Sequence, residues 1–489
     1  MTSYVLLVAV VLYFCMLVLI ARVTGKDEGN QAFFVGNRRS PWFLVAFGMI
    51  GASLSGVTFI SVPGWVGTSQ FSYMQVVLGY LVGYAVIAFV LMPIYYRLNL
   101  VSIYTYLQQR FGFWAYKTGA LFFLISRLIG ASFRLFLVAL VLHEVIFTRI
   151  TSIHIPFPVT VMVTVALIWV YTHRGGIKTI VYTDVIQTLF MLISVGISVY
   201  VVSDMFHQHG DSVGQLLSAS KYTRWLFLDD PMDGKFFVKQ FLGGAFIAIA
   251  MTGLDQDMMQ KNLSCRNIRD AQKNMMVFSM ILVVVNALFL VLGVLLYEYA
   301  AVANIPVPDK TDLLFPILAI DYLGPAAAIF FILGLIAAAY SSADSALAAL
   351  TTSVCVDFLD TEKMDTARQV KVRKRAHIGM SVMLVLVILV FGAMNDRSVI
   401  DALFTAAGYT YGPLLGLFAL GVLSKAKLRN NWTVVAACIA APLTGFWLKS
   451  KAVEWFGSYQ IGYELLVVNA LITIVYLLLF SLLPERKQA

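Results

Sequence analysis

Long apolar runs separated by short polar segments dominate this chain. We expect thirteen of these runs to form membrane-spanning helices, because each is at least about 17 residues long and carries few or no charges. The thirteen spans are predicted at about 3–21, 42–67, 73–96, 115–147, 155–172, 177–205, 236–260, 275–303, 325–356, 378–394, 398–422, 431–448 and 464–483. Residues 311–322 are expected to form a short helix outside the membrane.

The composition agrees with this pattern. Of the 489 residues, 60% are hydrophobic and only 12% are charged, against about 25% charged in soluble domains. The four cysteines are scattered without a CxxC pair, and the six histidines do not cluster at metal-ligand spacing, so neither a disulfide framework nor a zinc site is expected. No loop is long enough for a soluble domain. We expect an all-α, multi-pass integral membrane protein.

The basic residues predict the orientation. If the spans alternate, 24 of the 35 lysines and arginines fall on one side and nine on the other, while Arg127 and Arg134 lie within a span. The richer side is cytoplasmic by the positive-inside rule, which predicts an outside N-terminus and an inside C-terminus. The net charge of +9 then reflects topology, so no nucleic-acid partner is expected. The run "RQVKVRKRAH" (368–377) is predicted to face anionic lipid headgroups.

Two spans carry signals of a broken helix. The second contains "FGMIGASLSGVTF" (47–59), and the seventh contains "LGGAFIAIAMTGLDQD" (242–257). Transporters with inverted repeats bind substrate and ion where helices are interrupted, at matching places in the two halves. Spans two to six and seven to eleven would form two five-helix units of opposite orientation. The alternative is that the small residues only allow close helix packing.

The ninth span, with "AAAYSSADSALAAL" at 337–350, carries hydroxyls on one helix face. Positions spaced i, i+3, i+4 and i+7 share a face, and here they are Ala338, Ser341, Ser342 and Ser345. Asp344 flanks them and requires a partner, since a carboxylate in hydrocarbon costs about 2.5–3.5 kcal/mol. These oxygens suit a hard cation such as Na⁺, particularly opposite free carbonyls near Gly51 and Leu54. Back-bonding of each serine to its own helix is the alternative.

A second acid, Asp184, lies in "VYTDVIQT" (181–188) of the sixth span. It is about 9 Å along the helix from Lys178, at 1.5 Å per residue. This depth places it inside the membrane, and we expect it to have a functional partner.

Three segments resemble the sodium:solute symporters, the family of sodium–sugar, sodium–proline, sodium–sialic acid, sodium–monocarboxylate and iodide carriers. They are "AFFVGNRRSPWF" (32–43), "GGIKTIVYTDVIQTLFM" (175–191) and "GLIAAAYSSADSALAALTTSVCVDF" (334–358). The resemblance covers nearly the whole chain. It implies a ten-helix, 5+5 inverted-repeat core of the LeuT type. The expected units are an extra helix and loop (1–41), a first repeat (42–206), a second repeat with external loops (207–422) and two final helices (423–489).

The resemblance also implies ion sites. The main sodium site would comprise Gly51, Leu54, Ala338, Ser341 and Ser342. A second site in some members would correspond here to Asp184, Ser341 and Ser345. Asp344 departs from the pattern, because members with the second site carry serine there. It could bind sodium, hold a proton or pair with an arginine, so the number of ions per cycle stays open.

The substrate is expected beside the broken helices. Sialic acid carriers of the family have hydroxyl residues at the positions of Ser53, Ser55 and Thr58. Sugar carriers place an asparagine and a stacking tyrosine where this chain has Ala248, Met251 and Thr252, which argues against a stacked hexose. Met251 and Thr252 are nevertheless expected to contact the substrate, together with the three hydroxyl residues.

Two arginines favour an anionic solute. Arg127 and Arg134 share a face within the fourth span, and a carboxylate suits a buried guanidinium. Internal pairing with Asp184, Asp344 or Glu144 is the alternative. Phe404 is expected to close the pocket from the inside. The alternative is that this aromatic ring only packs against neighbouring helices.

The function expected is sodium-coupled import of a small organic solute, favouring a sialic acid or other sugar acid. Alternative substrates are a neutral sugar, an amino acid such as proline, a vitamin or a monocarboxylate. More distant alternatives are a proton-coupled carrier and a sodium-leak channel. An enzyme is not expected, because no histidine accompanies the Ser/Asp set, and a receptor would need an output domain. The expected location is the plasma membrane, that of bacteria by preference, with lipid around the protein and no required protein partner.

Overall fold

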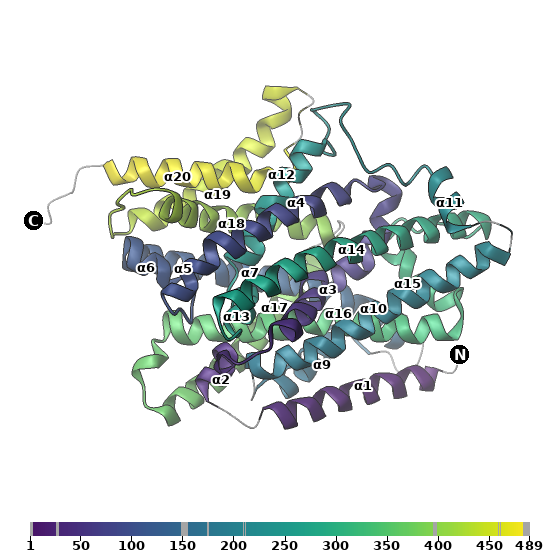
Figure 1. The fold of residues 1–489 in the computed structure, drawn as a ribbon, viewed down its shortest axis with the longest axis horizontal. Helices are drawn as coiled ribbons and strands as arrows, with labels where there is room; N and C mark the ends of the chain where they lie inside the picture. The colour runs from purple at the N-terminus through teal and green to yellow at the C-terminus, as the bar shows by residue number, and fades with distance from the viewer. Residues whose placement is uncertain are drawn as a thin grey trace, which may run out of the picture.

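The computed structural model describes residues 3–25, 29–147, 155–173, 176–208, 210, 212–394, 399–457, 459 and 461–482, and these contain helices but no β-strand (Figure 1). The helices of the first half are α1 (Ser3–Thr24), α2 (Asn30–Val35), η1 (Gly36–Arg38), α3 (Trp42–Ser69), α4 (Tyr73–Val86), η2 (Ile87–Leu91), α5 (Met92–Arg97), α6 (Thr105–Phe111), α7 (Phe113–Val141), η3 (Leu142–Phe147), α9 (Phe157–Thr172), α10 (Gly176–Gln208) and α11 (Val213–Ala219). Those of the second half are α12 (Phe237–Ala248), η4 (Ile249–Gly253), α13 (Gln256–Leu263), α14 (Ile268–Val302), η5 (Thr311–Leu313), α15 (Leu314–Asp321), α16 (Gly324–Ser353), η6 (Val354–Phe358), η7 (Thr361–Lys363), α17 (Thr366–Met394), α18 (Val399–Leu423), α19 (Thr433–Phe456) and α20 (Leu465–Leu482).

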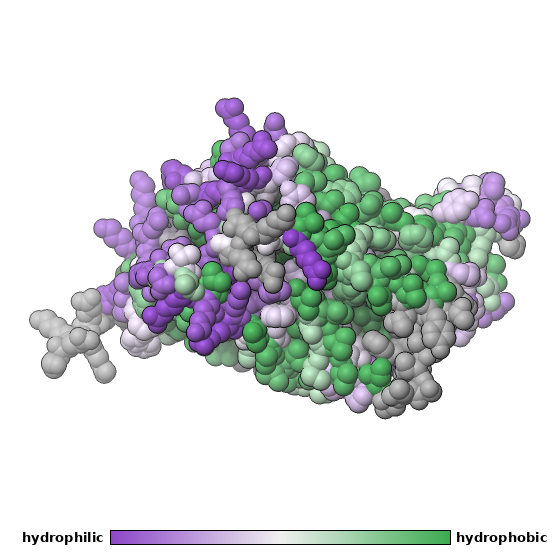
Figure 2. Space-filling model, turned by 90° about the horizontal axis from the view of Figure 1, so that it is seen from below, coloured by the Kyte–Doolittle hydropathy of each residue, from purple (hydrophilic) through white to green (hydrophobic). Residues whose placement is uncertain are grey.

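The apolar runs form the long helices. Among the described residues, ten helices are long and apolar enough to cross a membrane, and a bent pair, Phe237–Gly253 with Gln256–Leu263, adds one more candidate. Two apolar helices are shorter, Val8–Thr24 and Phe157–Thr172. Figure 2 shows an apolar belt between two ends where hydrophilic side chains gather, the larger gathering at the end where α20 finishes. The protein is therefore a multi-pass membrane protein.

Local sequence explains where several helices begin. Pro41 and Pro156 precede α3 and α9 in an extended conformation, and Pro325 occupies the first turn of α16. Proline suits these positions, because its fixed φ fits a first turn and its missing N–H has no acceptor to lose there. The short helix expected at 311–322 is confirmed as η5 and α15.

One predicted boundary is wrong. The loop between the ninth and tenth spans is predicted to extend to residue 377, but helix α17 already begins at Thr366. The segment contains no glycine or proline and is rich in good helix formers, so it continues the apolar helix. Arg373, expected to face lipid headgroups, is instead buried against the Phe33 ring at 4.5 Å and donates to Asn30 Oδ1 at 3.0 Å.

Both expected helix breaks are confirmed. Within α3, Ser55 has φ 36° and ψ 167°, which interrupts the helix at the small-residue cluster. The second break separates α12–η4 from α13, and the two parts are bent by 66°. Each break leaves backbone groups without helical partners at mid-length of a buried span.

Helices α3, α10 and α16 meet at the centre of the molecule, and α7 and α14 pack against α3. Helix α1 lies outside this group, against α9, α10 and α16, while α19 and α20 pack with α18 (Figure 1). The polar residues of α3 and α16 are thus held in the two most buried long helices.

Candidate substrate and sodium site

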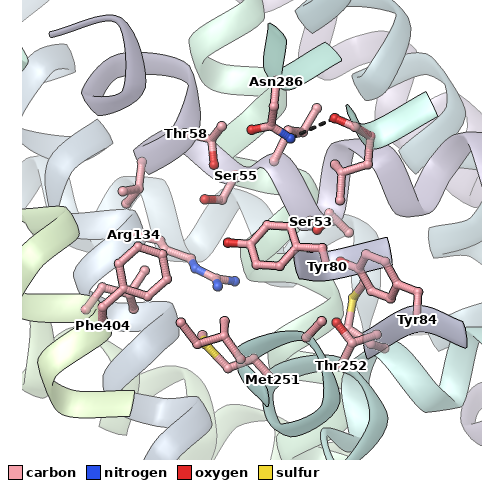
Figure 3. A pocket seen from close by; sticks show the side chains of 18 of the residues that line it. Ser53, Ser55, Thr58, Tyr80, Tyr84, Arg134, Met251, Thr252, Asn286 and Phe404 are labelled. Atoms are coloured by element: carbon pink, nitrogen blue, oxygen red, sulfur yellow. Dashed lines mark hydrogen bonds between the residues drawn. The ribbon is translucent and has the colours of Figure 1, made fainter. Parts of the chain in front are cut away.

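A cavity lies beside the break in α3 (Figure 3). Its lining includes all eight residues proposed for substrate binding, namely Ser53, Ser55, Thr58, Arg127, Arg134, Met251, Thr252 and Phe404. The cavity volume is about 80 Å³, below the roughly 300–1,000 Å³ of typical ligand pockets. A sugar acid would therefore require the lining side chains to move apart.

Arg134, from α7, points into this cavity (Figure 3). Its Nη1 donates to Ser342 Oγ at 3.2 Å, and its buried Nε has no hydrogen-bond partner. Within the described part of the chain it has no carboxylate partner. A guanidinium has five donors, so Arg134 retains the capacity to bind an anion.

Arg127, unlike Arg134, already has charged partners. It forms ion pairs with Asp257 and, at 3.7 Å, with Asp255. Tyr411 also donates to Asp255. None of the three acids considered as its internal partners is involved. Because its charge is already neutralised, Arg127 is better placed to stabilise the chain at the second helix break than to bind a substrate.

Sequence reasoning missed the aromatic side of the cavity. Tyr73, Tyr80 and Tyr84 of the α4 region line it, and the Tyr73 and Tyr80 hydroxyls lie 3.2 Å apart. Asn286 of α14 donates to Leu282 O at 2.8 Å, while its Oδ1 has no partner (Figure 3). The spacing of these tyrosines, seven and four residues apart, could have indicated a shared helix face.

Phe404 lies between two cavities, and its expected role in closing the substrate pocket stays a prediction. It lines both this cavity and a neighbouring one that includes Gly234 and Lys449. Its ring contacts Tyr463 with 5.1 Å between centroids. Gly234 lies in a loop and Lys449 in the last third of α19, both in regions that the charge pattern predicts to be outside.

The residues expected at the main sodium site come together where α3, α10 and α16 meet. Ser342 Oγ donates to the carbonyl of Ala52 at 3.2 Å, between Gly51 and Leu54. The Gly51 N–H donates to Thr188 Oγ1 at 3.1 Å. Ala338 is buried one helical turn before Ser342.

The donor set at this place fits a sodium ion. A Cβ on Gly51 would lie 3.3 Å from Ser341 Oγ and 2.4 Å from Thr188 Oγ1, so only glycine leaves this space open. Hydroxyl oxygens and the carbonyls beside a helix break are the ligands that sodium takes in such folds. Gly51, Leu54, Ala338, Ser341 and Ser342 would hold the ion.

Of the four residues considered for a second sodium site, Asp184 and Ser341 are hydrogen-bonded to each other, and each of the four also has another partner within the protein. Both oxygens of Asp184 are engaged, by Lys261 Nζ at 2.6 Å and by Ser341 Oγ at 2.8 Å. Ser345 Oγ donates to the Ser341 carbonyl of its own helix at 2.8 Å, as the back-bonding alternative predicts. Asp344 faces another direction and accepts from Tyr171 OH at 2.9 Å.

Lys261 is the residue that sequence reasoning placed wrongly. It directly follows the seventh predicted span (236–260) and is therefore predicted to lie in a loop, yet its side chain is 1% exposed. It lies on α13, and the bend before this helix brings it to Asp184 of α10. A buried aspartate requires a cation, and a search of span ends for one could have found Lys261.

A membrane-embedded helical bundle with two broken helices around an oxygen-lined site is typical of ion-coupled secondary transporters. The model of the sodium:solute symporter family matches residues 33–430. The chain belongs to this family.

Relatives agree with the assignment. The sodium/sialic acid symporter NanT of Aliivibrio fischeri is 25% identical over 462 residues, which cover 91% of this chain and 87% of that protein. The human sodium/iodide cotransporter is 24% identical, covering 89% and 67% of the two chains. The sodium-coupled monocarboxylate transporter 1 of Mus musculus is also 24% identical, covering 87% and 69%.

A solved structure shares the fold. It is the substrate-bound, outward-open state of a Na⁺-coupled sialic acid symporter, with a TM-score of 0.79 at 19% identity, covering 100% of this chain and 99% of that one. The similarity extends to α1, α19 and α20, since it covers both chains almost completely.

Proposed function

We propose that this protein imports a small organic anion together with sodium, and that a sialic acid or another sugar acid is the preferred substrate. The observation that carries this proposal is Arg134. It is a partly buried guanidinium that points into the cavity beside the α3 break, and it has no carboxylate partner among the described residues. A charge in such a place is costly unless a counter-ion arrives, and a substrate carboxylate supplies one.

The cavity supplies further groups for a hydroxylated acid. Ser53, Ser55 and Thr58 border it on one side, and Asn286 presents an unpartnered Oδ1. The relatives named above carry sialic acid, iodide or monocarboxylates, all of which are anions. The polar lining favours a sugar acid over iodide, because iodide needs few hydrogen bonds.

Sodium and substrate would be coupled through Ser342. Its hydroxyl contacts both the α3 carbonyl of Ala52 and the guanidinium of Arg134. A sodium ion at the main site would supply positive charge that fixes the α3 break against α16. Ser342 would then turn its oxygen lone pairs to the ion and release Arg134 for the substrate. Each ligand would thus favour the state that the other also favours.

The proposed topology has thirteen spans. The ten long helices, the bent pair and the two shorter apolar helices together supply this number. Helix α1 starts and α20 ends at opposite ends of the molecule (Figure 1), as an odd number of crossings requires. The basic segments support an outside N-terminus and an inside C-terminus, two inverted five-helix repeats at 42–206 and 207–422, and a bacterial inner-membrane location.

The test is the melting temperature of purified protein against a solute panel in NaCl and in matched KCl. The panel holds sialic acid, gluconate, hexoses, proline, pantothenate, lactate and iodide. A ligand that binds the native state raises the melting temperature by mass action. We expect a shift with the sugar acids that is larger in sodium than in potassium.

Uptake into proteoliposomes under a sodium gradient follows for each solute that gives a shift. If only neutral sugars or proline raised the melting temperature, the proposal of an anionic substrate would be contradicted. Equal shifts in sodium and potassium, with uptake that follows a proton gradient, would contradict sodium coupling.

A further inference from the structure

A further cavity lies where α1 and α9 end beside each other, and its described lining shares no residue with the substrate cavity. Its volume is about 410 Å³, within the roughly 300–1,000 Å³ of typical ligand pockets. The lining residues are Val18, Ala21 and Arg22 of α1, and Val170, Tyr171 and His173 at the end of α9. Helices α1 and α20 finish at the same end of the molecule (Figure 1), which the charge pattern predicts to be cytoplasmic.

One part of this α1–α9 cavity is apolar and borders the lipid-facing surface. Val170, which lines the cavity, is 44% exposed, and Leu19 and Val23 beside Arg22 on α1 are 61% and 62% exposed. On a membrane-spanning helix such side chains face lipid hydrocarbon. An acyl chain can therefore enter the cavity from the bilayer without crossing water.

Another part of the cavity is basic. Arg22 forms no ion pair within the described part of the chain. His173 Nδ1 donates to the Val170 carbonyl at 2.9 Å, and the His173 ring stacks on Trp169 with 4.7 Å between centroids. These contacts hold the imidazole in place and leave its Nε2 for a ligand. The cavity thus combines an apolar wall with groups that bind an anion.

We propose that the α1–α9 cavity binds an anionic phospholipid of the cytoplasmic leaflet. The lipid phosphate would lie at Arg22 and His173, and an acyl chain would lie against Val18 and Val170. Basic pockets between membrane helices on the cytoplasmic side are typical binding sites for acidic lipid headgroups. The proposal does not depend on which solute the protein carries.

The charge of the site selects the headgroup. Thr24 Oγ1 donates to Thr179 Oγ1 at 3.0 Å, so Lys178 at the start of α10 also lies near the end of α1. The choline or ethanolamine cation of a zwitterionic headgroup would be repelled by these basic side chains. A headgroup with a net negative charge, such as phosphatidylglycerol, brings no such cation.

Tyr171 connects this lipid site to the centre of the molecule. It lines the cavity, and its hydroxyl donates to Asp344 Oδ2 of α16 at 2.9 Å. A lipid that fills the cavity would hold α1 against α9 and would support the contact of α9 with α16. We therefore expect the bound lipid to raise the melting temperature of the protein, because it binds the native state.

The test is native mass spectrometry of the purified, delipidated protein with dioleoyl phosphatidylglycerol, and with dioleoyl phosphatidylcholine as the headgroup control. We expect the first phosphatidylglycerol to bind more tightly than the first phosphatidylcholine. Arg22→Gln should weaken phosphatidylglycerol about fivefold, the contribution of one basic side chain, whereas Arg22→Lys should keep most of the affinity, since a phosphate also binds a point charge. Arg97→Gln is the matched control, because Arg97 lies at the end of α5 on the same predicted side but does not line the cavity.

A second variant tests the acyl chain. Ala21→Phe fills part of the cavity without changing charge, and it should weaken phosphatidylglycerol as well. Melting temperatures measured with glycerol phosphate, which has no acyl chain, separate a lipid from a soluble phosphate. We expect phosphatidylglycerol to raise the melting temperature and glycerol phosphate to leave it unchanged.

Three results would overturn the lipid site. The first is equal affinity of the parent protein for the two phospholipids. The second is an equal loss of phosphatidylglycerol binding in Arg22→Gln and Arg97→Gln, or unchanged binding in Ala21→Phe. The third is an equal rise in melting temperature with glycerol phosphate, which would indicate a site for soluble phosphates. None of these results bears on sodium coupling, which is measured separately by uptake.

Discussion

The ion pair between Lys261 and Asp184 gives a prediction that can be worked from the structure. Its charged atoms are 2.6 Å apart, and both side chains are only 1% exposed. Lys261→Met keeps an unbranched apolar stem but removes the ammonium group. Asp184 is then left as a buried carboxylate whose one remaining donor is Ser341.

Breaking a buried pair by removing one partner costs about 3–5 kcal/mol. Unfolding entropy of about 2.1 cal/mol/K per residue corresponds to roughly 1 °C per kcal/mol in a chain of this length. Lys261→Met should therefore lower the melting temperature by about 3–5 °C in KCl. The double variant Lys261→Met with Asp184→Asn should recover most of this loss, because no unpaired charge remains.

Sodium provides a second measurement on the same variants. In Lys261→Met the free carboxylate of Asp184 becomes available to Na⁺, so replacing KCl by NaCl should raise the melting temperature more than in the parent. The double variant should lose this extra increment. Unchanged melting of Lys261→Met, with no coupling to Asp184→Asn in the double-mutant cycle, would refute the buried pair.

Three further predictions test other parts of the structure. Ser342→Ala should raise the sodium concentration for half-maximal uptake about fivefold, because one neutral ligand is lost; an unchanged sodium dependence would remove Ser342 from the site. Arg134→Lys should weaken an anionic substrate about tenfold by removing the bidentate fork, whereas Arg127→Lys should affect melting more than substrate affinity, and the reverse result would exchange their roles. Gly244→Ala should destabilise the fold by about 1–3 kcal/mol, because its Cβ would lie 2.1 Å from the Val76 carbonyl oxygen. Gly196→Ala, with no atom within 4 Å, is the control, and equal melting of the two variants would contradict the close α4–α12 approach.

The hydrophobic pattern by itself determined most of the fold. Apolar runs of spanning length have no soluble alternative, and the backbone must form helices when water is absent. The two breaks were also visible, because glycine, serine and proline in the middle of an apolar run weaken a helix there. The stripe Ala338, Ser341, Ser342 and Ser345 followed from the helical period alone.

Only the tertiary structure decided how the buried charges pair. A sequence shows that Asp184, Asp344, Arg127 and Arg134 lie at membrane depth, but any acid could face any base. The 66° bend before α13 brings Lys261 to Asp184 and Asp257 to Arg127, which leaves Arg134 and Asp344 without an ion-pair partner among the described residues. Ion pairing depends on distances of a few ångströms between helices far apart in the chain, and no local pattern encodes them. The structure therefore distinguishes Arg134 and Asp344 from Asp184 and Arg127, whose charges are paired within the protein.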